Sequence, residues 1–139
     1  ADDKFAEIQK ATEENKNFTI RHSISKKTKN FLLKEGFTEL PEQQVTTANS
    51  IRHIFKEHWV GNEKNPDQIP VTWEDIKHIP EIQQNYDNIK ISPYKNKQWQ
   101  TVIIYEKIID NHYYYLEKIN HRWQLETQTM YIKNIKKDS

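Results

Sequence analysis

The sequence contains no cysteine and only two glycines, Gly36 and Gly61, among its 139 residues. The absence of cysteine excludes disulfide bonds, thiolate metal sites and a cysteine nucleophile. Two isolated glycines do not form a glycine-rich loop of the kind that binds the phosphates of a dinucleotide cofactor. No apolar run approaches the roughly 20 residues of a membrane span. We therefore predict a soluble protein without a membrane partner and without a cofactor.

The chain also has no large excess of positive or negative charge. The chain has 21 basic and 20 acidic side chains and a formal net charge of +1, so affinity for nucleic acid would depend on local clusters of charge. The hydrophobic share is only 35%, against roughly 45–50% in typical globular proteins. Aromatic residues make up 12%, however, which argues against a disordered chain. The length fits one domain with a single core.

Two regions follow from the distribution of apolar residues. Residues 1–30 are polar, and we interpret them as an arm or linker that holds at most a short helix around residues 3–14. The domain is then expected at residues 31–139. A helix that starts near Lys26 should stop at Gly36, which suits the C′ position. After helices in the first half, strands are predicted at residues 89–91, 101–109, 113–119 and 123–132. The fold class is therefore α+β, with N-terminal helices packed on an antiparallel sheet of about four strands.

The clearest helix covers residues 47–58 and carries two histidines. The i, i+3, i+4, i+7 rule gives it an apolar stripe of Ile51, Ile54, Phe55 and His58. His58 therefore points toward the core. A purely structural role for this histidine is the alternative to a catalytic one. His53 lies on the other side of the helix, between the basic residues Arg52 and Lys56, so periodicity predicts that it is exposed and inert and favours His58. Imidazoles titrate near neutral pH, so such a pair can supply both a base and an acid.

A metal site on this helix is not expected. The i, i+5 spacing of the histidines is poor for a shared ion, because i, i+4 is the usual helical chelate. The nearby acidic residues Glu57, Glu74 and Asp75 are interpreted as solvated charges and helix caps.

The last predicted strand, at residues 123–132, carries a second set of candidate site residues beside the two histidines. Strict alternation places one row on a single face, formed by Thr127, Thr129, Tyr131 and Lys133. Gln128, Met130 and Ile132 would face the other way, toward the core. Hydroxyls and an ammonium aimed in one direction can hold an anionic substrate. A structural reading stays open, because threonine and tyrosine are also good strand formers.

The run of tyrosines at residues 113–115 also lies in a predicted strand. Tyr114 must face opposite to its two neighbours. One face would pack on a helix, and the other could stack on bases; packing and stacking both remain open.

Taken in order, several segments resemble the phage-type Barnase–EndoU–colicin–RelE-like (BECR) nuclease domains. They are residues 50–58, 69–76, 79–82, 102–107, 113–117 and 129–131, which together span about positions 45–133. The His-Ile-x-x-x-His helix and the closing Thr129-Met130-Tyr131 are the most specific parts. The chain departs from the pattern where Trp59 and Val60 precede Gly61, and where residues 85–87 read Asn-Tyr-Asp instead of Asn-Pro-Asp.

The resemblance implies a barnase/RelE-like fold and cleavage of RNA. It implies catalytic roles for His53, His58, Thr129 and Tyr131, and we expect substrate contacts from Lys133, Thr127, Arg52 and Lys56. Such domains are similar to toxins of phages, mobile elements and secreted systems. The expected partners are therefore RNA, tRNA included, and a cognate immunity or antitoxin protein, and the expected place of action is the cytoplasm of a target cell after delivery.

The implied reaction is a metal-independent transesterification within RNA. A base removes the proton of the ribose 2′-hydroxyl, which attacks the adjacent phosphorus, and an acid protonates the departing 5′-oxygen. Two other classes remain open. One is a binding module for RNA or protein that keeps the fold without the chemistry. The other is a nucleotidyl- or ADP-ribosyl-transferring toxin.

Overall fold

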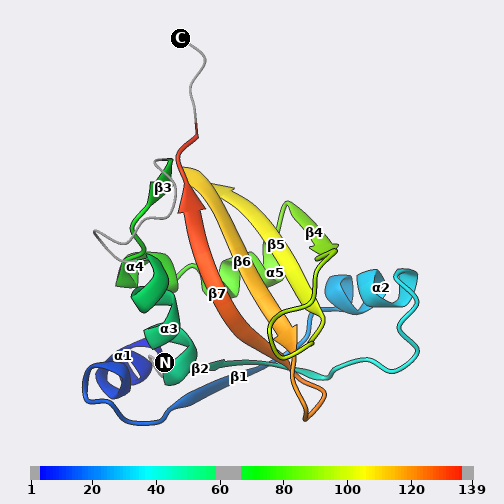
Figure 1. Cartoon of the computed structure of the whole chain (residues 1–139), viewed down its shortest axis with the longest axis horizontal. Helices are drawn as coiled ribbons and strands as arrows, with labels where there is room; N and C mark the ends of the chain where they lie inside the picture. The colour runs from blue at the N-terminus through cyan, green and yellow to red at the C-terminus, as the bar shows by residue number, and fades with distance from the viewer. Residues whose placement is uncertain (1–3, 59–66, 136–139) are drawn as a thin grey trace.

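The computed structural model describes residues 4–58 and 67–135. The strands in these ranges are β1 (Thr19–Ser23), β2 (Gln43–Thr47), β3 (Gln68–Ile69), β4 (Asn88–Ile91), β5 (Val102–Ile109), β6 (Asn111–Ile119) and β7 (Leu125–Lys133). The helices are α1 (Lys4–Glu13), α2 (Lys26–Lys34), α3 (Ala48–His58), α4 (Trp73–Ile76) and α5 (Ile79–Asn85). Figure 1 shows the long strands β5, β6 and β7 side by side, with α3 beside β7 and α5 behind the sheet. None of the helices in the described ranges is long and apolar enough to span a membrane.

The α+β class is confirmed, but the predicted size of the sheet is wrong. Within the described residues the sheet has seven strands in the order β1-β2-β7-β6-β5-β4, with β3 also paired to β7. It is not purely antiparallel, because β2 and β7 run parallel where Gln44 pairs with Leu125 and Val45 with Glu126. The sequence patterns miss β1, β2 and β3 because these strands are short and polar. β1 has a single aliphatic residue, Ile20, and β2 has only Val45.

Residues before position 30 pack into the same core as the rest of the chain, which differs from the expectation of an arm. Ile8 of α1 and Ile20 of β1 are buried and belong to the main hydrophobic cluster. β1 pairs along its whole length with β2, from Thr19 opposite Thr47 to Ser23 opposite Gln43. A few well-placed apolar side chains are enough to fix a polar segment when a neighbouring strand accepts its hydrogen bonds.

Two left-handed turns occur at residues that adopt this conformation readily, Gly36 and Asp110. Gly36 has a φ of 94° just after α2, and its amide donates to the carbonyl of Leu33. Glycine takes this conformation without the steric cost of a Cβ atom. Asp110, with a φ of 61°, connects β5 to β6, which correspond to the predicted strands at residues 101–109 and 113–119.

β7 contains a bulge that its sequence does not reveal. Leu116 of β6 lies opposite Thr129, but Glu117 lies opposite Thr127, so Gln128 is an extra residue in β7. A bulge shifts the alternation of side chains by one position. The predicted single row is therefore wrong at Thr127, whose hydroxyl makes its hydrogen bonds among buried groups. Thr129, Tyr131 and Lys133 keep the shared face that was predicted for them.

Two short strands hold the outer edge of β7 at its ends. β2 pairs with its start, and β3 pairs with its end, where Gln68 lies opposite Lys133. Between these pairings no described strand contacts the edge, and α3 lies along it instead (Figure 1). This arrangement brings the histidine helix next to the bulged part of β7.

A buried carboxylate lies under the same strands. Glu117 is 0% exposed and accepts hydrogen bonds from the hydroxyls of Tyr105 at 2.6 Å and Tyr115 at 2.8 Å. The amides of Gln44 and Gln83 also donate to it, at 2.9 and 3.0 Å. Burial raises the pKa of the Glu117 carboxyl, and the four uncharged donors act in the opposite direction. The Tyr115 hydroxyl also lies 2.7 Å from that of Thr127, so this network reaches β7 next to the bulge.

Candidate active site

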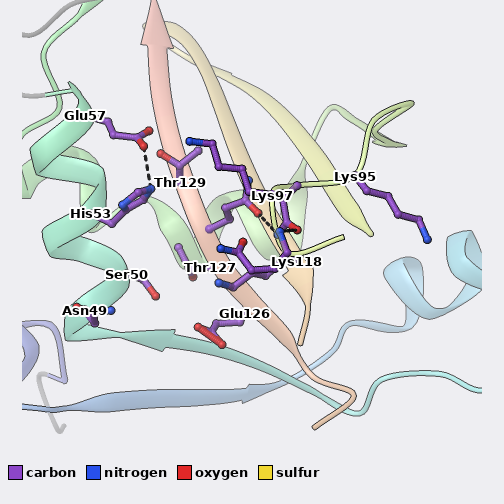
Figure 2. Close-up of a pocket in the computed structure, with 13 residues that line it drawn as sticks. Asn49, Ser50, His53, Glu57, Lys95, Lys97, Lys118, Glu126, Thr127 and Thr129 are labelled. Carbon is purple, nitrogen blue, oxygen red and sulfur yellow. Dashed lines mark hydrogen bonds and ion pairs between the residues drawn. The ribbon is translucent and has the colours of Figure 1, made fainter. Parts of the chain in front are cut away.

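A cavity of about 500 Å³ lies between α3 and β7. One wall is α3, through His53 and Glu57, and another is residues 126–129 of β7. Residues 95–98, in the connection between β4 and β5, and Lys118 of β6 complete the lining. Three lysines and two glutamates line it, so the cavity has a positive balance of charge in a chain that is nearly neutral. Figure 2 shows His53 and Glu57 on the helix and Thr127 and Thr129 on the strand beside it.

Glu57 connects the two histidines of α3. Its Oε1 lies 2.9 Å from Nε2 of His53, and its Oε2 lies 3.6 Å from Nε2 of His58. The His53 side chain is 49% exposed and lines the cavity, whereas His58 is 7% exposed and does not. The apolar stripe correctly places His58 in the interior and His53 outside it. A carboxylate that bonds an imidazole nitrogen fixes the orientation of the ring, which is how a base or acid is held ready.

Thr129 presents a buried hydroxyl to the cavity. The residue is 8% exposed, and its Oγ1 has no hydrogen-bond partner among the described residues. Buried hydroxyls are rarely left without a partner, because desolvation without a hydrogen bond costs about 1–3 kcal/mol. An unpartnered donor in the lining of a basic cavity is suited to binding an anionic oxygen.

Thr127, the other predicted substrate contact in this part of β7, also lines the cavity. It is 1% exposed, however, and its hydroxyl lies 2.7 Å from that of Thr46 and 2.7 Å from that of Tyr115. Its hydrogen-bonding capacity is therefore used within the protein. Thr127 shapes the cavity floor more than it offers a free group to a ligand.

Tyr131 and Lys133 lie on the open face of the sheet, outside the cavity lining. The Tyr131 ring stacks on Tyr114 with centroids 4.8 Å apart, and Tyr114 stacks on His112 at 4.3 Å. Lys133 Nζ lies 5.4 Å from the centre of the Tyr114 ring. Tyr114 thus faces away from the buried Tyr113 and Tyr115, as its place in the strand requires. Tyr131 also contacts His58, with ring centroids 5.9 Å apart, which links this face to the histidine helix.

The two basic residues that flank His53 in sequence do not line the cavity. Arg52 donates a hydrogen bond at 3.3 Å to the carbonyl of Lys16, in the connection between α1 and β1. Lys56 is exposed on α3 and likewise lies outside the lining. In a helix, successive residues point about 100° apart, so neighbours of a cavity residue in sequence face elsewhere.

Sequence patterns do not reveal the charged residues that line the cavity. Glu57 was interpreted as a solvated charge, although its i, i+4 spacing from His53 was an available signal. Lys95 and Lys97 lie in the connection between β4 and β5, where no periodicity indicates direction, and Lys118 faces the cavity from β6. Figure 2 shows Lys97 and Lys118 across the cavity from His53, while Lys95 extends outward.

No group of three or more histidine, aspartate or glutamate side chains with metal-binding geometry occurs in the described parts of the chain. The departure at Gly61, with Trp59 and Val60 before it, lies outside the described residues, as does the lysine-containing end beyond position 135. At residues 85–87, where the sequence reads Asn-Tyr-Asp instead of the Asn-Pro-Asp of the family pattern, Tyr86 is buried, and its ring packs against that of Tyr105 with centroids 5.4 Å apart.

Residues 22–139 match the family described as phage-Barnase-EndoU-ColicinE5/D-RelE like nuclease3. The chain belongs to this family. The match runs from the end of β1 through β7 and includes both walls of the cavity, so it confirms the BECR resemblance and supports a nuclease domain. No curated protein and no solved structure matches the chain.

Proposed function

We propose that this BECR nuclease is a metal-independent endoribonuclease that cleaves RNA by attack of the ribose 2′-hydroxyl. The observation that carries the proposal is the His53–Glu57 pair, at 2.9 Å, in a lysine-lined cavity that also contains the unpartnered hydroxyl of Thr129. An acid, a base and a phosphate ligand are the three functions that this reaction needs.

In the proposed mechanism, Glu57 and His53 transfer the two protons. The Glu57 carboxylate accepts the proton of the 2′-hydroxyl, whose oxygen forms a bond to the adjacent phosphorus. The bond from phosphorus to the 5′-oxygen breaks, and the protonated imidazole of His53 gives its proton to that oxygen. The products are a 2′,3′-cyclic phosphate and a 5′-hydroxyl. Because the two side chains touch, a proton can return from Glu57 to His53 and restore the starting state.

Thr129 and the lysines would stabilise the charge that develops on phosphorus. The Thr129 hydroxyl has no hydrogen-bond partner among the described residues, so it can bind a non-bridging phosphate oxygen without losing another hydrogen bond. Lys97 and Lys118, across from His53, can neutralise the neighbouring phosphates. Fixed donors around the reacting phosphate act without the reorganisation that water would require.

His58 and Tyr131 would support the site from behind. His58 is buried, contacts Glu57 and packs on the Tyr131 ring, so we assign it the orientation of Glu57 instead of a direct proton transfer. Burial and the neighbouring Tyr114 raise the pKa of the Tyr131 hydroxyl, which therefore stays protonated at neutral pH. Tyr131 then contributes through its ring.

The test uses a short RNA oligonucleotide with excess chelator and a denaturing gel. We expect two fragments, of which the upstream one ends in a cyclic phosphate. The same oligonucleotide with a single 2′-deoxynucleotide at the cut site should stay intact, because the nucleophile is missing. Cleavage of that analogue at the same bond, or activity that needs a divalent metal, would refute the mechanism. Binding of RNA without any cleavage would favour the binding module.

Replacing Thr129 with valine separates its role in binding from its role in the fold. The free energy of unfolding should stay the same or rise by up to about 1 kcal/mol, because the lost hydroxyl has no partner in the protein. The rate of RNA cleavage should fall by roughly 10- to 100-fold, since one donor to the phosphate is removed. Thr129→Ser keeps the hydroxyl and should stay near the wild-type rate. Equal rates for the valine and serine variants would show that the hydroxyl does not contact substrate.

A toxin role for the protein is part of the same proposal, and it requires a cognate inhibitor. A protein that covers this lysine-lined cavity would need acidic side chains at its centre, because unlike charges across an interface raise both association rate and specificity. Co-purification of such a protein with the Lys97→Glu variant as readily as with the wild type would contradict this complementarity.

A further inference from the structure

Two turns at one end of the sheet share the same sequence pattern and the same hydrogen bonds. Residues 96–100 and residues 120–124 both read Asn-x-x-Trp-Gln. In the first, the Asn96 side-chain oxygen accepts from the amides of residues 98 and 100, at 3.1 and 2.8 Å. In the second, the Asn120 side-chain oxygen accepts from the amides of residues 122 and 124, at 2.9 and 3.1 Å. The amides of Trp99 and Trp123 donate to the carbonyls of Asn96 and Asn120, at 2.9 and 3.0 Å.

Both turns hold a tryptophan in a strained backbone conformation. Trp99 has a φ of 63° and Trp123 a φ of 59°, in the left-handed region that glycine and asparagine favour and bulky residues avoid. Burial of the indole rings does not offset this cost, since Trp99 is 77% exposed and Trp123 is 42% exposed. Strain that the fold does not need for its own packing is typical of positions that bind ligands.

The two rings line one groove that adjoins the active-site cavity. This tryptophan groove has a volume of about 460 Å³ and is lined by Trp99, Trp123, Thr101, Ile119, His121 and their neighbours. Gln98 lines both the groove and the active-site cavity, so the two spaces share a wall. Asn96 also donates a hydrogen bond at 3.0 Å to the side chain of Gln128, the extra residue of the β7 bulge. The first turn is thereby attached to the strand that carries Thr129.

Positive charge accompanies the rings. Lys95 Nζ lies 5.5 Å from the centre of the Trp99 ring, and Lys97 lies within the turn and lines the active-site cavity. Arg122 precedes Trp123 in the second turn. Aromatic rings with lysines and arginines between them suit a ligand with alternating flat bases and phosphates.

We propose that the tryptophan groove binds unpaired nucleotides of an RNA substrate next to the scissile phosphate, with bases stacked on Trp99 and Trp123. This inference rests on the proposed ribonuclease function and names its substrate class as single-stranded or looped RNA. Stacking on an aromatic ring accepts any base but requires that the base is not paired. Lys95 and Lys97, which lie in the first turn's connection and line the active-site cavity, bind the phosphates of these nucleotides.

The test measures binding and cleavage separately. Binding is followed by fluorescence anisotropy with a labelled single-stranded RNA and with the duplex of the same sequence. The 2′-oxygens of both are methylated, which removes the nucleophile and prevents cleavage during the measurement. Trp99→Gly and Trp123→Gly should each weaken binding of the single strand about tenfold. Their thermal midpoints should equal or exceed that of the wild type, because glycine relieves the left-handed strain. Cleavage of a dinucleotide, which fills only the active-site cavity, should be unchanged.

Tyr94→Ala is the matched control, because Tyr94 is an aromatic residue 80% exposed in the same connection between β4 and β5 but lines neither cavity. It should bind like the wild type. The groove assignment is overturned if the glycine variants bind single strands as tightly as the wild type, if Tyr94→Ala weakens binding equally, or if the duplex binds as well as the single strand. If the wild type cleaves neither substrate but binds single strands in a way that depends on Trp99 and Trp123, the groove assignment is supported and only the ribonuclease function is overturned.

Discussion

Replacing His53 with alanine is expected to lower kcat for RNA cleavage by about 10²–10⁴-fold, the usual contribution of one general acid. The fold should survive, because the side chain is half exposed and its ion pair with Glu57 lies at the surface. Exposed pairs of this kind contribute about 0–1 kcal/mol to stability. The measurement is single-turnover cleavage of an RNA oligonucleotide, with circular dichroism to check folding.

Arg52→Ala is the matched control, since it changes the adjacent residue of the same helix, outside the cavity. It should cleave at nearly the wild-type rate. Glu57→Gln should lose as much activity as His53→Ala, because an amide cannot accept the proton. His58→Ala should lose less than either, because His58 acts through Glu57. A His58 variant that is more damaged than the His53 variant would reverse these assignments, and wild-type activity in His53→Ala would remove His53 from the mechanism.

Replacing Glu117 with alanine is expected to destabilise the protein by about 3–5 kcal/mol, because each buried donor left without an acceptor costs about 1–3 kcal/mol. Four buried donors, from Tyr105, Tyr115, Gln44 and Gln83, would lose the carboxylate that accepts their hydrogen bonds. Glu117→Gln keeps the volume and one acceptor and should cost much less. Urea unfolding of the three proteins at neutral pH measures the difference, and an alanine variant as stable as the wild type would contradict this account of the core.

The same carboxyl gives the stability a defined dependence on pH. Its pKa is raised in the folded protein above the ordinary value of 4.5, so the folded state binds the proton more tightly than the unfolded state. The resulting stabilisation is fully present below pH 4.5 and is lost as the pH rises through the folded pKa. Compared with Glu117→Gln, the wild type should therefore lose stability across this window. If the two proteins show parallel curves of unfolding free energy against pH, Glu117 does not titrate differently in the two states.

Much of the fold could be predicted because its longer elements have strong periodicity. The helix of residues 47–58 and the strands β5, β6 and β7 carry many apolar residues in regular spacing, which is the pattern that burial imposes. β1 and β2 were missed because a five-residue strand with one aliphatic side chain has no period to detect. Their place is determined by pairing with distant strands, which local sequence does not record.

The site was only partly predictable, for two physical reasons. The bulge at Gln128 shifts the alternation of side chains by one position, so residues before it and after it in β7 do not follow one rule. Strict alternation therefore places Thr129 on the correct face of the sheet but Thr127 on the wrong one. Lys97 and Lys118 reach the cavity from segments more than twenty residues apart, and only tertiary structure brings them together. His53 was indicated only by the resemblance to the nuclease family, because periodicity alone predicts an exposed histidine without a role; the i, i+4 spacing of Glu57 was the local signal for its partner.

The outer edge of β7 is paired with β2 at its start and with β3 at its end but with neither between them, and this affects local stability. β5 and β6 are held by strands on both sides, so amides in their ladders should exchange with solvent mainly through global unfolding. Residues 127–131 of β7 have a strand on one side only, and α3 covers the other. Local separation of α3 from the sheet therefore breaks no strand pairing. Native-state hydrogen exchange would detect this opening. The half of the site that carries His53 and the half that carries Thr129 would then open as distinct units, and a ligand that touches both would slow exchange in both at once.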